Sequence, residues 1–285
     1  MGTDVIAAIG YQSDWLDILS AGFMRSAMIG GVLVALSAGL LGYFVIVRQH
    51  AFAAHALAHI GFPGATGAVL IGVPVTLGLA VFTVGGALAI GLLGKRLAER
   101  EIATGTVLAL ATGIGVLFNS MTTKNAGSVT NVLFGNLLAV SDDQLWTFGL
   151  FTLALAVVLA VVARPLVFAS VNPEVAEAKG VPVRLLGVVF MVALALVITM
   201  AVQVVGTLLL FGLVVTPAAA ALAVSARPAT VAVLSTVFGV VCVLVGLLLA
   251  AMFNLPPSFV IVTLSFLIWL VAIVATRERH PHAVG

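Results

Sequence analysis

Residues 229–252 of the chain read ATVAVLSTVFGVVCVLVGLLLAAM, an apolar run without a charged side chain. A helix needs about 20 such residues to cross the hydrocarbon core of a bilayer. Other stretches that meet the same hydropathy criterion lie at 23–46, 52–72, 74–94, 102–121, 143–163, 185–202, 204–224 and 257–275. The sequence therefore predicts an all-α, polytopic membrane protein with about nine transmembrane helices.

The composition agrees with membrane integration and excludes other classes. Of the 285 residues, 62% are hydrophobic and 8% are charged, whereas about a quarter of the residues of a soluble domain are charged. A net charge of +2 is too small for a disordered or nucleic-acid-binding chain, so no nucleic-acid partner is expected. We expect residues 1–22 to form an external amphipathic segment at the interface, residues 23–276 the transmembrane domain, and residues 277–285 a cytoplasmic tail.

The basic residues predict the orientation. If the first span runs from outside to inside, every lysine and arginine except Arg25 and Lys124 lies on the cytoplasmic side. Because cytoplasmic loops are enriched in Lys and Arg, the sequence predicts an external N-terminus and a cytoplasmic C-terminus.

Two further patterns predict packing. Gly31, Ala35 and Gly39 are spaced to lie on one helix face, where backbones can approach closely. Residues 125–139 are too polar to face lipid and apolar enough to pack, which favours a short external or re-entrant helix.

His55 and His59 are the candidate metal ligands. Their i, i+4 spacing places both imidazoles on one helix face, and neutral imidazole binds zinc, copper, nickel and iron. The alternative is a pair of interfacial histidines near the cytoplasmic end of the span, which is also how His50 is interpreted. Ala56 replaces the general-base glutamate of an H-E-x-x-H motif, so proteolysis is not predicted and no catalytic residue is assigned.

Residues 172–180, NPEVAEAKG, predict a short cytoplasmic surface helix. Asn172 can cap it and Pro173 can occupy its first turn. Glu174 and Glu177 favour the positive end of the helix dipole, and Gly180 marks the close. Such a segment is either a solvated connector or a docking surface for a cytoplasmic partner.

Thr216 and Pro217 interrupt the span at 204–224, as a simple kink or as a pathway hinge.

The remaining polar positions bear on the energy source. Acidic residues lie in the N-terminal segment, in loops or at span ends, which disfavours a proton-coupled carrier. The stretch GLLGKR at 91–96 lacks the spacing of a phosphate-binding loop, so energy from ATP must come through a partner.

In order along the chain, several motifs resemble the ABC-3 family, the permease subunits of zinc, manganese and iron ABC importers. These motifs are FMRSAMIGG at 23–31, GYFVIVRQHAFAAHALAHIGFPGATGA at 42–68, VTNVLFGNLLAVSDDQL at 129–145, NPEVAEAKGVPV at 172–183 and VVGTLLLFGLVVTPAAAA at 204–221. The resemblance covers nearly the whole chain after residue 22.

The resemblance implies a bacterial inner-membrane core of two permease subunits, taken as a homodimer. It also implies ABC ATPase subunits at the cytoplasmic face and an external solute-binding protein that delivers the cation. The segment at 172–180 becomes the ATPase-coupling helix, with matches at Pro173, Glu174, Ala176 and Gly180, and Asn172 in place of the usual aspartate. His55 replaces an aspartate that usually precedes the histidine at position 59.

From these features we expect a permease subunit, not an enzyme, of an ATP-driven importer of divalent metal ions that works by alternating access. Zinc is the favoured cargo because His55 exchanges a hard oxygen for a borderline nitrogen; manganese and iron are the alternatives. No permanently bound cofactor is expected. The rival interpretations are a partner-free secondary metal carrier and a membrane assembly subunit in which the histidines only pack.

Overall fold

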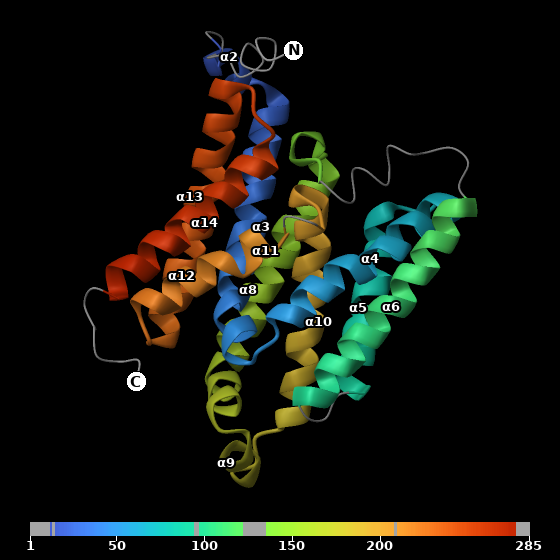
Figure 1. Cartoon of the computed structure of the whole chain (residues 1–285), viewed down its shortest axis with the longest axis vertical. Helices are drawn as coiled ribbons and strands as arrows, with labels where there is room; N and C mark the ends of the chain where they lie inside the picture. Colours follow the sequence, from blue (N-terminus) through green and yellow to red (C-terminus); the bar gives the residue numbers. More distant parts are fainter. Residues whose placement is uncertain (1–11, 13–14, 94–96, 122–134, 208–209, 278–285) are drawn as a thin grey trace. The chain divides into compact units, whose positions relative to one another are not determined.

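The computed structural model describes residues 12, 15–93, 97–121, 135–207 and 210–277. Its helices are labelled in Figure 1. Their bounds are α2 Trp15–Ser20, α3 Gly22–Val47, α4 Ala51–Ile71, α5 Val75–Leu93, α6 Leu97–Met121, the 3₁₀ turn η1 Leu137–Ala139, α8 Asp142–Val171, α9 Pro173–Ala178, α10 Val183–Val205, α11 Leu210–Val214, α12 Thr216–Val224, α13 Pro228–Phe253 and α14 Pro257–Arg277. Within these ranges the chain is helical and contains no strand.

The helices confirm the polytopic all-α prediction. Eight of them are long and apolar enough to cross a membrane, and each corresponds to one predicted span. The longest, α8, extends to Val171 and so continues past the predicted end of its span. The predicted span at 204–224 is divided into the short helices α11 and α12, and residues 208–209 within it lie outside the described residues.

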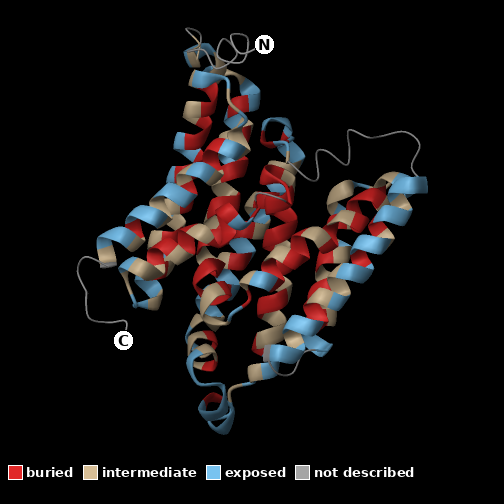
Figure 2. Cartoon of the chain, in the orientation of Figure 1, coloured by how far each residue is buried: buried red, intermediate tan, exposed pale blue. Residues whose placement is uncertain are grey.

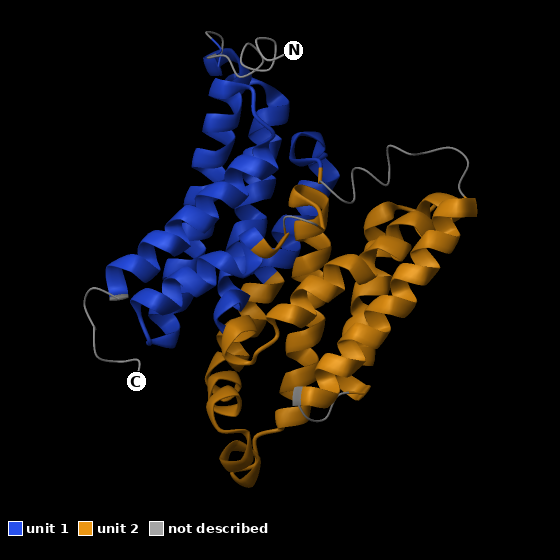
Figure 3. Ribbon diagram, in the orientation of Figure 1, with its two compact units in different colours: residues 1–43, 136–153, 212–285 blue, residues 44–135, 154–211 orange. Residues whose placement is uncertain are grey.

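The chain forms two compact units, shown in different colours in Figure 3. Unit 1 comprises residues 1–43, 136–153 and 212–285; unit 2 comprises residues 44–135 and 154–211. Helices α3, α8 and α11 contribute residues to both units. The candidate histidines and the 172–180 segment belong to unit 2, whereas Thr216 and Pro217 belong to unit 1.

Unit 1 is held together by close contacts between small residues. A Cβ atom at Gly39 of α3 would lie 2.5 Å from the Cα of Thr236 in α13, and one at Gly31 would lie 2.6 Å from Cγ1 of Val243. The hydroxyls of Ser37 and Thr152 also share a buried hydrogen bond of 2.9 Å. The structure therefore confirms the small-residue face predicted for α3.

Unit 2 packs α4 against α5, α6 and α10. The burial colours of Figure 2 show buried residues along α4 and α10 and many exposed ones on α6. Leu110 and Val116 of α6 are apolar yet exposed, as expected where a helix faces lipid. A Cβ atom at Gly64 of α4 would lie 2.6 Å from the carbonyl carbon of Gly78 in α5, so glycine permits the close approach of these helices.

A group of polar side chains joins α5 to α10 inside unit 2. The hydroxyls of Thr83 and Thr199 are 2.7 Å apart, and Thr76 donates to Oε1 of Gln203 at 2.7 Å. Nε2 of Gln203 donates to the carbonyl of Thr199 at 2.9 Å. We call these four residues the α5–α10 ladder; its hydrogen bonds satisfy polar atoms that would otherwise be costly inside a membrane.

Two segment predictions fall largely outside the described residues. Of the predicted external or re-entrant segment at 125–139, the structure describes residues 135–139, which include η1. Of the predicted interfacial segment at 1–22, it describes Gln12 and residues 15–22, which include α2 and the first residue of α3. The N–H of Gln12 donates to the carbonyl of Met252 at 2.9 Å.

Candidate metal site and partner-docking helix

Helix α4 brings His55 and His59 together as predicted. Their ring centroids are 4.9 Å apart, with an edge-to-face angle of 76°, and both side chains are half-buried. The Nδ1 atom of His55 is buried and has no hydrogen-bond partner in the described part of the chain. A buried nitrogen without a partner costs free energy, and coordination of a cation would satisfy it.

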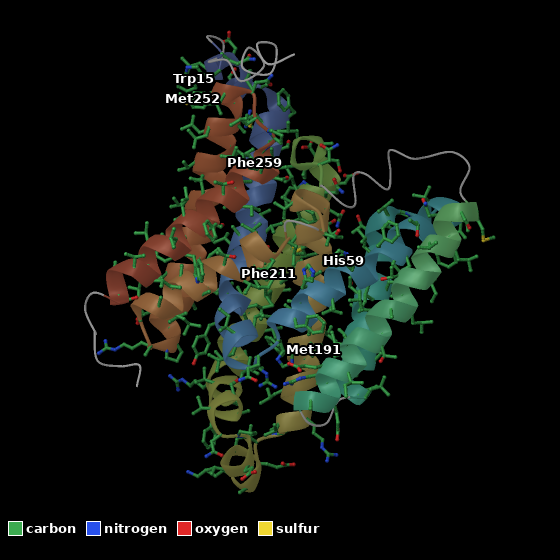
Figure 4. All side chains as sticks on the ribbon, viewed as in Figure 1. Trp15, His59, Met191, Phe211, Met252 and Phe259 are labelled. Carbon is green, nitrogen blue, oxygen red and sulfur yellow. The ribbon has the colours of Figure 1, made fainter. Side chains whose placement is uncertain are left out.

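The environment of the pair is apolar on its inner side. Ala54, Ala56 and Leu57 of the same helix are fully buried, so the imidazoles lie at the edge of a packed helix face. From α11, Phe211 presents its ring edge-to-face to His55 with a centroid distance of 6.3 Å. Figure 4 labels His59 on α4 and Phe211 on α11.

The histidine pair does not form a closed metal cage. Among the residues that the structure describes, no group of three or more His, Cys, Asp or Glu side chains could hold a metal ion. A structural zinc site uses four protein ligands. Two imidazoles leave coordination positions for water, which suits an ion that must bind and then leave.

The segment at 172–180 forms the predicted short helix, α9. Oδ1 of Asn172 accepts a hydrogen bond from the N–H of Val175 at 3.1 Å, and Pro173 occupies the first turn. Gly180 has a φ of 81°, a left-handed conformation that glycine adopts without strain. The predicted start at Asn172 and Pro173 and the glycine close are therefore confirmed. Glu174 lies in the first turn as predicted, whereas Glu177 lies in the last turn, away from the positive end of the helix dipole.

Only one residue of α9 is buried. Ala176 is fully buried, while the other predicted coupling residues, Asn172, Pro173, Glu174, Glu177 and Gly180, are exposed. Val175 is 42% exposed although apolar. The helix thus presents two carboxylates and an apolar side chain to its surroundings.

The interruption at Thr216 and Pro217 is also present. Helix α11 ends at Val214, and α12 begins at Thr216 with Pro217 in its first turn. Pro217 is buried and Thr216 is half-buried. The break follows from proline, which lacks the N–H that would continue the helix.

One cluster was not recognised from the sequence. His50 is 2% exposed, although its position predicts an interfacial side chain. Its Nδ1 lies 2.7 Å from the carbonyl oxygen of Arg48, and its Nε2 lies 3.2 Å from Nη1 of Arg100. Since a carbonyl accepts and a guanidinium donates, Nδ1 carries the proton and Nε2 accepts. The ring is held neutral between two cations.

We call Arg48, His50 and Arg100 the cationic cluster. Nη1 of Arg48 donates to Oγ of Ser170 at 3.2 Å, and its guanidinium lies 5.3 Å from the ring centroid of Phe190. Burial and the charges of Arg100 and Arg48 lower the pKa of His50 to about 3. Burial and the charge of Arg100 lower the pKa of Arg48. The sequence offered no signal for this cluster, because Arg100 is distant from His50 along the chain.

The chain matches the ABC 3 transport family over residues 20–276. It is 29% identical to the manganese transport system membrane protein MntC of Listeria innocua, over 90% of this chain and 91% of that protein. It is also 29% identical to the manganese import system permease protein ScaB of Streptococcus parasanguinis, over 92% of this chain and 95% of that protein.

Solved structures share the fold. PsaBC from Streptococcus pneumoniae in complex with Fab is similar with a TM-score of 0.81 and 27% identity, over 91% of this chain and 94% of that chain. An inward-facing putative metal-chelate type ABC transporter has a TM-score of 0.70 and 16% identity, over 88% of this chain and 86% of that chain. The second likeness concerns the fold alone.

Proposed function

Because the chain belongs to the ABC 3 transport family, we propose that it is the permease subunit of an ATP-driven importer of divalent metal ions. The observation that carries the proposal is the histidine pair on α4, where the buried Nδ1 of His55 has no hydrogen-bond partner among the residues that the structure describes. His55 and His59 are transient ligands in this proposal. Relatives named as manganese permeases support it over most of the chain.

Manganese is the cargo that the relatives favour. Two of them, matched over at least 90% of this chain, carry manganese in their names, and none of these names supports the zinc preference drawn from His55. Zinc remains the second candidate on one observation: both side chains of the pair are imidazoles, which suit zinc better than manganese. In either case two ligands completed by water allow release.

The proposal assigns α9 to contact with a separate ABC ATPase. Asn172, Pro173, Glu174, Glu177 and Gly180 would form the contact surface, and Ala176 would anchor α9 within unit 2. The exposure of these carboxylates and of Val175 supports this assignment, because it leaves them accessible to a partner. An external solute-binding protein and a second permease subunit, taken as identical, complete the proposed assembly.

Thr216 and Pro217 are proposed as a hinge of the transport pathway. Alternating access requires an element that absorbs backbone rotation. The helix interruption between α11 and α12 supports this role.

In the same proposal the N-terminus is external and the C-terminus cytoplasmic.

The decisive experiment measures whole-cell metal content by mass spectrometry. A strain that lacks this protein is complemented with the native chain, with His55→Ala plus His59→Ala, or with Thr66→Val, under manganese or zinc limitation. Thr66 lies on the same helix, and its hydroxyl only donates to carbonyls of α4, which makes it a matched control. Restoration of one metal by the native chain and Thr66→Val, but not by the double variant, supports the proposal and identifies the cargo. Equal restoration by all three contradicts the histidine roles.

The rival secondary carrier is separated by co-purification. A carrier has no reason to retain an ATPase, whereas the proposed permease does. Glu174→Arg plus Glu177→Arg on α9 should release the ATPase, because it reverses both exposed charges. Arg227→Glu, an exposed charge reversal at the N-cap of α13, should retain it. A native chain that purifies without any ATPase would favour the carrier.

A further inference from the structure

The cationic cluster lies where several helices of unit 2 end. Arg48 and His50 connect α3 to α4, Arg100 is in the first turn of α6, and Ser170 is in the last turn of α8. Consecutive spans cross a membrane in alternate directions, so the end of α3 and the start of α4 lie on one face, together with the start of α6 and the end of α8. The cluster is therefore at the level of the lipid headgroups, on the cytoplasmic face in the predicted orientation.

Among the residues that the structure describes, no hydrogen bond joins the two arginine side chains of the cluster to a carboxylate. In the described residues, Arg48 uses one side-chain hydrogen bond, to Ser170, and Arg100 uses one, to His50. A guanidinium has five N–H donors. Nε of Arg48 is buried without a hydrogen-bond partner. Glu101, the next residue of α6, has an exposed side chain.

Two guanidinium groups without an anion between them raise the free energy of the folded protein. Two guanidinium groups close enough to influence one another repel, and partial burial strengthens the repulsion because it removes screening water. His50 cannot relieve it, since the hydrogen bonds to Arg48 and Arg100 hold the imidazole neutral. An anion that accepts from both guanidinium groups would remove the repulsion and fill the unused donors. Both arginine side chains remain partly exposed, so an anion can reach them.

We propose that the cationic cluster binds the phosphate group of an anionic phospholipid, with Arg48 and Arg100 donating to its oxygens. The guanidinium fork matches the geometry of phosphate oxygens, and basic pockets between transmembrane helices bind lipid headgroups. The ring of Phe190, which contacts both His50 and the guanidinium of Arg48, orients the Arg48 side chain. This site is separate from the proposed metal path and does not depend on its cargo.

The test uses the full-length permease, with any subunits that co-purify, in nanodiscs of phosphatidylcholine alone or mixed with phosphatidylglycerol. Thermal unfolding and lipid retention in native mass spectrometry are measured for the native chain, Arg48→Gln, Arg100→Gln and Arg184→Gln. Arg184 is the matched control because it is an exposed arginine at the start of α10. A further arm adds inorganic phosphate to the phosphatidylcholine nanodiscs.

Phosphatidylglycerol should raise the unfolding temperature of the native chain and of Arg184→Gln. It should have little effect on Arg48→Gln and Arg100→Gln, whose retained phosphatidylglycerol should fall about tenfold, the loss expected for one charge-assisted hydrogen bond. Equal responses in all four proteins would overturn the site. A full response to inorganic phosphate alone would overturn the lipid as its source. If Arg48→Gln does not fold, Arg48→Lys and Arg100→Gln give the same test, and Arg48→Lys should retain an intermediate amount of lipid because it keeps the charge.

Discussion

The α5–α10 ladder and the histidine pair are two polar groups inside unit 2 that differ in how their hydrogen-bonding atoms are used. In the ladder, the hydroxyls of Thr76, Thr83 and Thr199 and the amide of Gln203 all bond to protein atoms. In the pair, Nδ1 of His55 is buried without a partner among the described residues. The ladder therefore contributes to packing, whereas the pair keeps unused bonding capacity.

Hydrogen bonding separates the polar residues of a membrane helix that serve packing from those that are candidates for function. Polarity inside a span is costly in both groups. In the ladder the cost is offset by hydrogen bonds between α5 and α10, so stability alone accounts for its residues. For Nδ1 of His55 the described residues provide no such hydrogen bond, and coordination of a cation would supply the missing partner. The cationic cluster also has unused hydrogen-bonding groups, but these are donors, so an anion would complete them.

Removal of the histidine pair is expected to have the largest effect. His55→Ala plus His59→Ala should lower metal uptake at least about 100-fold, since loss of metal ligands costs no less than loss of their supporting contacts. The same variant should unfold at the native temperature or above it, because it removes a buried atom without a partner. Uptake of radioactive manganese and thermal unfolding are measured on the same preparation.

One result would show that the histidine pair, like the ladder, only contributes to packing. If the double variant unfolds at a much lower temperature and its uptake falls only in proportion to the folded protein, the histidines are packing residues. Thr66→Val, on the same helix, is the reference for both measurements.

Acid should destabilise the protein through His50. Its pKa is about 3 in the folded chain and near 6.5 when unfolded, so between these values the unfolded chain binds the additional proton. Stability therefore falls as pH decreases from 6.5 toward 3, by about 2 kcal/mol at pH 5. Chemical unfolding at a series of pH values measures the loss.

His50→Gln should flatten this dependence, because glutamine stays neutral between Arg48 and Arg100. An unchanged pH profile in the variant would show that another group titrates. The ladder contains no titratable side chain and should contribute nothing to the pH dependence of stability.

Restoring an oxygen ligand should change the selectivity of the pair. His55→Asp, which reproduces the aspartate usual in the family resemblance, should raise the ratio of manganese to zinc uptake about tenfold, since carboxylate suits manganese and imidazole suits zinc. Competitive uptake of the two metals measures the ratio. A variant with lower uptake of both metals and an unchanged ratio would contradict a ligand role for position 55.

The structural features that could be predicted from the sequence are those that depend on residues close together along the chain. Hydropathy located the eight long helices because length and apolarity are local properties. Asn172 and Pro173 predicted the start of α9, and Pro217 predicted the break before α12, because capping and proline act within one helical turn. The i, i+4 spacing predicted the proximity of His55 and His59 for the same reason.

Contacts between distant residues could not be predicted in this way. Thr83 and Thr199 are separated by 116 positions, and His50 and Arg100 by 50. Neither separation along the chain indicates that the residues are in contact, because only the packing of the helices brings them together. This is why the sequence predicts no partner for His50, which the structure buries beside Arg48 and Arg100.

The smallest expected effect tests the ladder itself. Thr83→Val and Thr199→Val each remove one hydroxyl of the 2.7 Å contact, and a double-mutant cycle should give a coupling of about 0.6 kcal/mol, typical of hydrogen bonds between membrane helices. Metal uptake per folded molecule should stay at the native level in all three variants. Each remaining threonine still donates to a carbonyl of its own helix, Thr83 to Leu79 and Thr199 to Ala195, so no variant leaves a buried hydroxyl without a partner. Loss of uptake without loss of stability would show that a fully bonded polar group also serves transport, and the distinction between bonded and unbonded polar residues would then fail in this protein.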